Sequence, residues 1–337
     1  MSEMPVTSLL QEKVDLQLHQ AVDRDLINPL PDLRAILEYQ MGWDEAADSP
    51  ARGKRLRPLI LLLSTYAAGA FWEPALPAAA AVELLHNFTL IHDDIQDSSL
   101  LRRGKPTVWT KWGVAQAINA GDCMMGLAQL SLLELAKEYP PEQVTQVAEL
   151  FNRTFVELTR GQYLDLAYEV EDAIPVEKYQ WMVDGKTGAL ISACMEIGAI
   201  LGGASRQLVD QMALFGRKVG RAFQIQDDWL GIWGIDQITG KSNMSDLLER
   251  KKSYPVVLGI DAKGAFASEW MRVDKIDPVE ATRLADLLVH EGIKNMTEDA
   301  FAHEYASALD LYSRIDFAPD RKQALMELVQ SMLTRLK

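Results

Sequence analysis

Segments with the apolar spacing of an α-helix cover most of this chain, and they restrict the fold more than any other feature. The spacing predicts helices over residues 54–69, 77–97, 110–137, 142–170, 176–201, 205–231, 278–291, 294–313 and 320–336. Proline and glycine punctuate these segments, for example at Pro140-Pro141 and Gly202-Gly203, while no strand-like alternation of useful length is present. The sequence therefore predicts an all-α, single-domain many-helix bundle over residues 1–337, in which residues 1–30 form an N-terminal helix and lead-in.

The charge and cysteine content restrict the compartment and the partners. The 337 residues are 48% hydrophobic and carry a formal net charge of −14, which disfavours nucleic acid and anionic membranes as general partners. The only cysteines are Cys123 and Cys194, as is common in a reducing cytoplasm. Met1 to Gln20 lacks the pattern of a signal peptide, and no apolar run reaches the ~18 residues that span a bilayer. We therefore expect a cytoplasmic protein with no integral membrane segment and no nucleic-acid partner.

An aspartate cluster ends one strongly apolar predicted helix. Asp93, Asp94 and Asp97 follow apolar residues directly, and Arg102 and Arg103 come just behind them. Asp93 and Asp97 lie one turn apart on the same helix face. Because the dipole at a helix C-terminus disfavours negative charge, a bound cation would stabilise these carboxylates. Three aspartates could instead form a solvated helix end, but the apolar approach and the two arginines favour a binding site.

A second cluster ends another apolar predicted helix. It contains Asp227 and Asp228, and Gln224 shares a helix face with Asp228 at a spacing of four residues. Gly231 occupies the equivalent position after Asp227, so this cluster has two carboxylates rather than three. Clustered hard oxygen ligands without a nearby cysteine indicate Mg²⁺.

Basic groups accompany both clusters. Lys241 and Lys251 follow the second one, while Lys54 and Arg57 would share a face near the start of an earlier helix. Lys186-Thr187-Gly188 interrupts a long apolar helix, where glycine is normally destabilising. Each of these could be a solvated charge or a packing glycine. Together, in an acidic chain, they indicate a phosphorylated, polyanionic substrate.

In their order along the chain, these motifs resemble those of the trans-type isoprenyl diphosphate synthases, or polyprenyl synthetases. The resemblance covers about residues 30–335. It depends on Gly53-Lys54-Arg55-Leu56-Arg57-Pro58, His86, Asp93-Asp94-x-x-Asp97 with Arg102-Arg103-Gly104, Lys186-Thr187-Gly188, Phe223-Gln224-x-x-Asp227-Asp228, Gly240-Lys241, Ser245-Asp246-Leu247 and Lys251-Lys252-Ser253-x-Pro255. A single Asp-Asp-x-x-Asp motif is weak evidence, whereas the whole ordered series is specific.

The resemblance implies an isoprenoid-synthase fold with a central active-site cavity, where the two aspartate motifs face each other around three Mg²⁺ ions, for which Mn²⁺ could substitute. It implies that the metal ligands are Asp93, Asp97 and Asp227, supported by Asp94 and Asp228. The allylic diphosphate would be held by Arg102, Lys186, Lys241 and Lys251, and isopentenyl diphosphate by Gly53, Lys54, Arg57, His86 and Arg103. Thr187 and Gln224 would direct oxygen dipoles toward a carbocation. The family also implies a homodimer.

The implied reaction is the head-to-tail condensation of isopentenyl diphosphate with dimethylallyl, geranyl or farnesyl diphosphate, by ionisation, condensation and elimination. The resemblance places a chain-length gate five residues before Asp93, at Phe88, with Thr89 and Leu85 beside it. One aromatic residue there, without an insertion in the motif, resembles synthases of geranylgeranyl diphosphate (C20). Farnesyl diphosphate (C15) is the alternative. On an ideal helix Phe88 lies about 140° from Asp93, so the gate needs help from a neighbouring helix.

Other classes of protein explain the motifs less well. A class I terpene cyclase would have Ser and Glu where this chain has Gly231 and Ile235, and it would leave Lys54, Arg57 and Arg103 unexplained. A head-to-head synthase would show Asp-x-x-x-Asp motifs instead. A non-catalytic subunit of a heteromeric synthase would have lost aspartates or lysines that are present here. An ATP-dependent phosphotransferase is disfavoured because no phosphate-binding glycine loop follows a strand. Gly231, where many members of the family carry a third aspartate, puts only the coordination of the third ion in doubt.

Overall fold

The computed structural model describes residues 7–24, 26–45, 52–234, 244–273 and 275–334. The chain divides into two compact units. Unit 1 comprises Met1–Phe155, Ala193–Asp210 and Asp316–Met326, and unit 2 comprises Val156–Ser192, Gln211–Ile315 and Glu327–Lys337. Four of the five boundaries fall inside helices, which are α7 (Pro141–Glu169), α9 (Ala189–Leu201), α10 (Arg206–Trp233) and α17 (Pro319–Leu333). The fifth boundary, between Ile315 and Asp316, lies in the connection that precedes α17. The single-domain extent of 1–337 stays a prediction.

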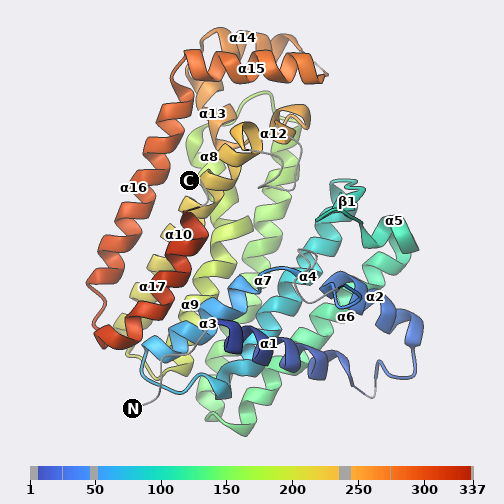
Figure 1. The fold of residues 1–337 in the computed structure, drawn as a ribbon, viewed down its shortest axis with the longest axis vertical. Coiled ribbons are helices and arrows are strands. Elements are labelled where there is room, and N and C mark those ends of the chain that lie inside the picture. Colours follow the sequence, from blue (N-terminus) through green and yellow to red (C-terminus); the bar gives the residue numbers. More distant parts are fainter. Residues whose placement is uncertain (1–6, 25, 46–51, 235–243, 274, 335–337) are drawn as a thin grey trace. The chain divides into compact units, whose positions relative to one another are not determined.

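The remaining elements belong to one unit each (Figure 1). Unit 1 contains α1 (Thr7–Val22), α2 (Pro31–Met41), α3 (Leu56–Ala67), a 3₁₀ turn (Glu73–Ala75), α4 (Leu76–Gln96), β1 (Leu101–Arg102), β2 (Lys105–Pro106), α5 (Val108–Trp112), α6 (Val114–Leu133) and a second 3₁₀ turn (Glu134–Lys137). Unit 2 contains α8 (Val176–Val183), a π-helical turn (Asp184–Gly188), α12 (Ser245–Leu248), α13 (Tyr254–Asp261), α14 (Ala265–Arg272), α15 (Pro278–His290) and α16 (Ile293–Ser313).

The all-α prediction is confirmed, and every predicted helical segment coincides with helix in the structure. Three details differ. The segment 110–137 is broken at Gly113, whose φ of 82° lies outside the helical region. Helices α12, α13 and α14 lie in a part of the chain for which no helix was predicted. The antiparallel pair β1–β2 is a short hairpin that the absence of β-signals did not anticipate.

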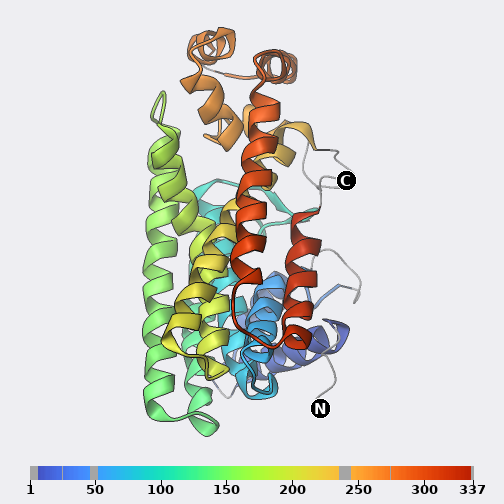
Figure 2. The same cartoon turned by 90° about the vertical axis from the view of Figure 1, so that its left-hand side faces the viewer.

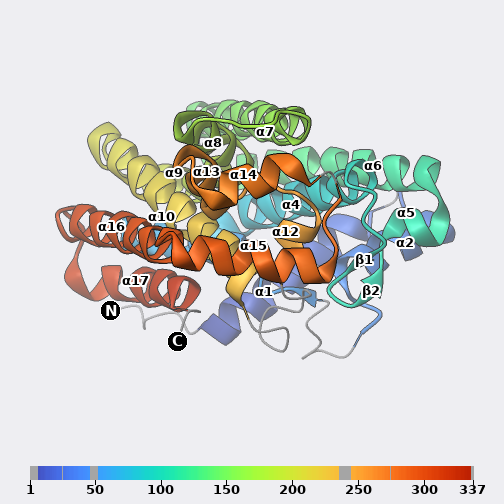
Figure 3. The same ribbon diagram turned by 90° about the horizontal axis from the view of Figure 1, so that it is seen from above.

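Helix α4 is the central helix of unit 1. It packs against α1, α3 and α6, and it lies alongside α6 in two views (Figures 1 and 3). The run Ala78–Ala81 is fully buried, since its small side chains allow neighbouring helices to approach closely. Helix α3 is buried from Pro58 to Ala67, as expected for a helix that is apolar on every face. These contacts fix the end of α4 that carries Asp93 and Asp97.

One helical segment is apolar enough to be tested as a membrane span. Among the described residues, Glu73–Gln96 meets the criteria of length and composition, although no continuous apolar run was expected to do so. Of the most apolar part of this helix, 72% is buried inside the protein. That degree of burial is the property of a core helix, and by itself the segment is weak evidence for a membrane span.

Unit 2 has a second apolar cluster around its short helices. Phe266 and Trp270 of α14 are fully buried and stack with ring centroids 5.6 Å apart. They pack with residues of α12, α13 and α15, such as Leu247, Val256 and Leu284. Helices α14 and α15 lie side by side, and α15 leads into the start of α16 (Figures 1 and 2). This cluster holds the segment from Met244 to Tyr254 in place.

Candidate active site

The three aspartates at the end of α4 have different environments. The side chain of Asp94 is 2% exposed, and Nε of Arg102 donates to both of its carboxylate oxygens, at 2.8 and 3.0 Å. Burial raises the pKa of Asp94, and the bonds from Arg102 oppose that increase. Asp93 is half-buried and Asp97 is exposed. Asp93 and Asp97 therefore supply two hard oxygen donors one turn apart, while Asp94 anchors Arg102.

The hairpin after α4 positions the two arginines. Its turn residues, Arg103 and Gly104, both have positive φ angles, 52° and 79°, as a type I′ turn requires. For a non-glycine residue this conformation costs roughly 1–2 kcal/mol. A side chain at Gly53 would begin 2.7 Å from Nη1 of Arg103, so the glycine allows the guanidinium to lie against the backbone. The hairpin thus brings Arg103 to the Gly53–Pro58 motif.

His86 lies among several arginines in unit 1. Nη1 of Arg57 lies 3.1 Å from Nε2 of His86. Since arginine can only donate, Nε2 accepts and the imidazole proton is on Nδ1. Burial, and then the nearby charges of Arg57, Arg103 and Arg102, hold the pKa of His86 well below its usual 6.5. The result is a neutral histidine in a strongly cationic environment, which favours an anionic ligand.

The remaining basic residues of the motif have separate roles. Lys54 is exposed. Arg55 has a side chain that is only 3% exposed, and it donates to Asp15, to Glu83 and to the carbonyl of Met41. Arg55 is thus a structural arginine that joins three segments of unit 1, and the sequence pattern alone did not separate it from its neighbours. The structure brings Gly53, Arg57, His86 and Arg103 together.

The predicted chain-length gate lies in an aromatic cluster. Phe88 is 9% exposed, and its ring lies 4.5 Å from that of His92 and 5.5 Å from that of Phe155 on α7, edge to face. Gly121 of α6 approaches the same place, since a side chain there would begin 2.4 Å from Nε2 of His92. Leu85 is fully buried, and the hydroxyl of Thr89 donates to the carbonyl of His86. Helices α6 and α7 therefore supply neighbours to Phe88 and His92, and the role of Phe88 as a gate stays a prediction.

In unit 2, Lys186 and Thr187 lie in the π-helical turn Asp184–Gly188. Such turns are rare and often occur at functional sites. Close glycine contacts hold this one on two sides. A side chain at Gly161 of α7 would begin 2.1 Å from the backbone nitrogen of Lys186, and one at Gly220 of α10 would begin 2.7 Å from Cα of Gly188. These contacts explain why glycine is tolerated inside helices here.

The side chains of this turn are engaged by neighbouring residues. Lys186 forms an ion pair with Asp165 of α7. The hydroxyl of Thr187 donates to Oε1 of Gln224 at 2.6 Å, and Nε2 of Gln224 donates to Oδ1 of Asp228 at 2.7 Å. The structure thus links Thr187, Gln224 and Asp228 in one hydrogen-bonded chain.

Asp228 is 6% exposed and accepts from neutral donors. Its Oδ2 accepts from the hydroxyl of Tyr179 at 2.6 Å and from the backbone N–H of Tyr254 at 2.7 Å. Burial, followed by the charge of Asp246, raises the pKa of Asp228 to about 7, although all three hydrogen bonds favour the carboxylate. Burial and the charge of Asp228 also raise the pKa of Tyr179 well above its usual value.

Gly231 has a steric explanation. A side chain at this position would begin 2.4 Å from Oδ2 and 2.5 Å from Cγ of Asp246, which is 6% exposed. The carboxylate of Asp246 therefore occupies the space in which a third aspartate of the α10 motif would begin. Asp227, the predicted metal ligand, is half-buried.

The two lysines predicted beyond α10 differ in what the structure shows. Lys241 lies outside the described residues. Lys251 forms an ion pair with Glu249 at 2.8 Å and is 42% exposed. The neighbouring Lys252 is 7% exposed, and its ammonium lies 5.7 Å from the centre of the Trp270 ring.

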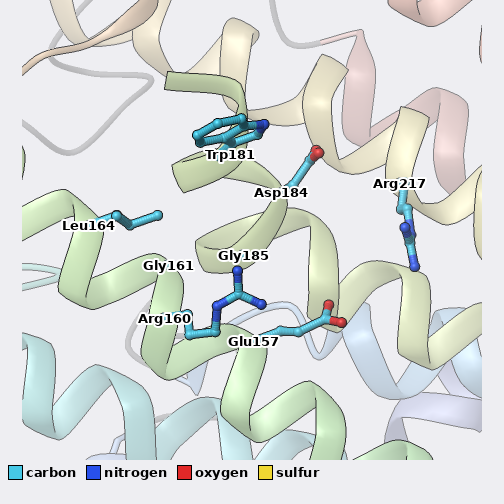
Figure 4. A pocket seen from close by; sticks show the side chains of 8 residues that line it. All are labelled: Glu157, Arg160, Gly161, Leu164, Trp181, Asp184, Gly185 and Arg217. Atoms are coloured by element: carbon cyan, nitrogen blue, oxygen red, sulfur yellow. The ribbon is translucent and has the colours of Figure 1, made fainter. Parts of the chain in front are cut away.

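A cavity in unit 2 lies against the turn but away from these side chains (Figure 4). Its volume is about 360 Å³, and it is lined by Glu157, Arg160, Gly161, Leu164, Trp181, Asp184, Gly185 and Arg217. Lys186 and Thr187 are not among these residues. This hollow of unit 2 therefore does not coincide with the predicted catalytic residues.

Several residues of the site were missed by sequence reasoning. They are Tyr179, Tyr254, Asp165 and Phe155, while Asp246 was quoted as part of a motif but was given no role. For Asp165, the signal that could have been used is Gly161, a glycine in the middle of a long predicted helix. The other contacts join elements that are separated in the sequence, and no local sequence pattern predicts them.

The carboxylates fit magnesium better than a metal bound by protein ligands alone. In the described part of the chain, no group of three or more His, Cys, Asp or Glu side chains is arranged to hold a metal ion. Asp93, Asp97 and Asp227 instead offer single carboxylates in partly open positions. Mg²⁺ is commonly held by one or two carboxylates, with water and substrate phosphates completing its shell.

Comparison with known proteins gives consistent matches over the chain. The sequence pattern of a family described as Polyprenyl synthetase matches residues 44–284. The (2E,6E)-farnesyl diphosphate synthase of Mycobacterium tuberculosis is 35% identical over 98% of this chain and 93% of its own length. The geranylgeranyl diphosphate synthase of Methanosarcina mazei is 42% identical over 61% of this chain and 63% of its own length.

Solved structures share the fold. A polyprenyl synthetase from Streptomyces coelicolor A3(2) is 34% identical and superposes with a TM-score of 0.86, over 98% of this chain and 100% of that one. The geranylgeranyl pyrophosphate synthase from Corynebacterium glutamicum, complexed with isoprenyl diphosphate and magnesium, is 26% identical and superposes with a TM-score of 0.84, over 98% of each chain.

Proposed function

Because the chain belongs to the polyprenyl synthetase family of trans-prenyl diphosphate synthases, we propose that it condenses isopentenyl diphosphate with an allylic diphosphate and releases geranylgeranyl diphosphate (C20) as its main product. The allylic substrate would be dimethylallyl, geranyl or farnesyl diphosphate. The observation that carries the proposal is the cationic cluster of unit 1, in which Arg103 lies against Gly53 and Arg57 bonds to a neutral His86.

Asp93, Asp97 and Asp227 would hold Mg²⁺, with three ions bound in total and Mn²⁺ able to substitute. When bound, these ions supply the positive charge that a departing diphosphate requires. The hard oxygen chemistry of the three carboxylates supports this assignment. Magnesium also accompanies the isoprenyl diphosphate bound to the Corynebacterium glutamicum relative.

Two sets of cations would hold the two diphosphates. Arg102, Lys186, Lys241 and Lys251 would hold the allylic one, and Lys54, Arg57, His86 and Arg103 the isopentenyl one. Asp94 fixes the direction of Arg102, and Asp165 fixes that of Lys186, so neither cation has to be ordered when substrate binds. The pKa of His86, held low by burial and then by its arginine neighbours, would rise when an anion binds.

The reaction would proceed in three steps. The allylic C–O bond breaks, and the diphosphate leaves with the electron pair. The double bond of isopentenyl diphosphate attacks the allylic cation and forms the new C–C bond. The resulting cation loses a proton, which the released diphosphate accepts, and a new double bond remains. The oxygens of Thr187 and Gln224 would stabilise the allylic cation, while the apolar walls would exclude water that would otherwise quench it.

The aromatic cluster around Phe88 supports a C20 product, because Phe155 and His92 brace the ring at the predicted gate. The farnesyl diphosphate synthase among the relatives keeps C15 as the alternative. The test is to incubate the purified chain with Mg²⁺, isopentenyl diphosphate and each allylic primer, and to measure product length by mass spectrometry. No turnover would contradict the enzyme proposal, and a C15 end product would contradict the C20 assignment.

Substitution of the gate sharpens this test. Phe88→Ala should add at least one C5 unit to the product, and Phe88→Leu should do so to a smaller extent with better retained stability. Phe71→Ala, at an aromatic residue that is 68% exposed, is the matched control and should leave product length unchanged. An unchanged product from both Phe88 variants would show that the gate lies elsewhere. We also propose a cytoplasmic homodimer, which analytical ultracentrifugation and cell fractionation would test.

A further inference from the structure

The hydrogen bonds around Asp228 have a fixed direction. The backbone N–H of Tyr254 can only donate, and it donates to Oδ2 of Asp228, as does the hydroxyl of Tyr179. All three of the hydrogen bonds to Asp228 favour its ionised form, and an ionised carboxylate can only accept. The amide of Gln224 must therefore present its donating nitrogen to Asp228, which it does at 2.7 Å.

This orientation determines what Thr187 can do. With its nitrogen turned to Asp228, Gln224 presents its oxygen to Thr187, and the Thr187 hydroxyl donates to that oxygen at 2.6 Å. A hydroxyl has one hydrogen and two lone pairs. Once the hydrogen is used, Thr187 can offer only oxygen lone pairs to any other partner. Lone pairs stabilise a cation, whereas an outward O–H dipole would destabilise it.

We infer that Tyr179 and Asp228 are positioning residues, which act through Gln224 to keep the hydroxyl oxygen of Thr187 electron-rich toward the allylic cation. The inference rests on the proposed function, in which Thr187 faces that cation. It assigns Asp228 a role in hydrogen-bond direction rather than in metal binding. The geometry supports this role, because both carboxylate oxygens already accept bonds from the protein.

Asp228→Asn is the variant that reverses the chain without changing its shape. The side-chain oxygen of the introduced asparagine would still accept from Tyr179 and Tyr254, but its amide nitrogen would now donate to Gln224. Gln224 would turn over, and its own nitrogen would donate to Thr187. The hydrogen of Thr187 would then point away from Gln224. We expect kcat to fall by about 10- to 100-fold, with the KM for the allylic diphosphate and the half-saturating Mg²⁺ concentration within about twofold of wild type.

The matched rescue is the double variant Asp228→Asn/Gln224→Glu. The introduced asparagine donates to one oxygen of the introduced glutamate, and the other glutamate oxygen accepts from Thr187, so the original direction returns with the same net charge. Most of the lost kcat should return. A role in packing or in metal binding does not predict this recovery. A double variant no faster than Asp228→Asn, or a raised Mg²⁺ requirement in Asp228→Asn, would overturn the inference.

A double-mutant cycle at Thr187 and Tyr179 keeps the inference testable if the double variant Asp228→Asn/Gln224→Glu folds poorly. Thr187→Val removes the oxygen isosterically and should lower kcat about as much as Asp228→Asn does. Tyr179→Phe, added to Thr187→Val, should then change kcat by less than about twofold, whereas alone it should lower kcat measurably. Equal effects of Tyr179→Phe in both backgrounds would refute action through Thr187. Absence of turnover in the wild-type chain would instead contradict the proposed function, so the two failures are distinguishable.

Discussion

The two aspartate motifs share a local pattern but bury their second carboxylate in opposite ways. In unit 1, Asp94 is neutralised by the guanidinium of Arg102. In unit 2, the hydrogen bonds that the described residues donate to Asp228 come from a tyrosine, an amide and a backbone N–H rather than from a cation. The ion pair with Arg102 compensates the negative charge of Asp94, whereas the neutral donors around Asp228 determine the direction of the hydrogen bonds that continue through Gln224. The first motif therefore holds the guanidinium of Arg102, and the second orients the amide of Gln224 and the hydroxyl of Thr187.

The largest expected effect concerns the less buried carboxylate proposed as a metal ligand in each motif, which is Asp93 in the first and Asp227 in the second. Asp93→Asn and Asp227→Asn should each lower turnover by about 10²- to 10³-fold, because each removes one of the charged ligands proposed for Mg²⁺. Asp32→Asn, at an exposed carboxylate, is the control. Initial rates and thermal shifts, both followed through a Mg²⁺ titration, would measure the effect. Wild-type Mg²⁺ dependence in either variant would remove that aspartate from the metal site.

The next largest effect concerns the partners of the two buried carboxylates, Asp94 and Asp228. Arg102→Leu leaves the buried charge of Asp94 without its partner and should lower the free energy of unfolding by about 3 kcal/mol. Tyr179→Phe leaves Asp228 with two other donors and should cost only about 1 kcal/mol. Urea unfolding without Mg²⁺ would measure both. Asp94→Asn added to Arg102→Leu should recover part of the loss. Equal losses in the two single variants would show that the motifs do not differ as described.

A smaller effect is expected at Gly231. Gly231→Asp places a side chain where the carboxylate of Asp246 lies and should destabilise the fold by about 2 kcal/mol. Asp246→Gly in the same chain frees that space, so the double variant Gly231→Asp/Asp246→Gly should be more stable than Gly231→Asp alone. Thermal unfolding would compare them. If the double variant were the less stable one, the two positions would not share one volume.

The smallest effect is a pH dependence of the free energy of unfolding, which we expect from His86 in unit 1. The pKa of His86 is low in the folded state, so the unfolded chain binds its proton first as the pH falls below the usual 6.5. Stability contributed by neutral His86 is therefore present above pH 6.5 and is lost as the pH falls below it, by at most about 1.4 kcal/mol per pH unit. Urea unfolding between about pH 7.5 and 5.5, a range of roughly two units, would measure the slope. His86→Gln should flatten it, and an equal slope in both proteins would exclude His86 as its source.

Much of the fold was predictable because it depends on local periodicity. Long apolar segments such as 142–170 and 205–231 appear as α7 and α10, and Asp277 caps α15 with bonds to the backbone of Val279 and Glu280, as a helix start does. Helix α13 was missed because it is short and follows directly on a charged loop. The hairpin was missed because its turn has Arg103, with a positive φ, before Gly104, in place of the Asn-Gly pair that usually marks such a turn in a sequence.

By itself, the sequence determined the helical architecture and the position of the two carboxylate motifs, since these depend on residue type and on spacing along one helix. The tertiary structure decided which aspartate of each motif is buried and which groups donate hydrogen bonds to it. It also decided why position 231 is glycine. Those outcomes depend on contacts between helices far apart in the chain, such as Tyr179 with Asp228 and Phe88 with Phe155. Packing sets these contacts, and no local pattern of residues encodes them.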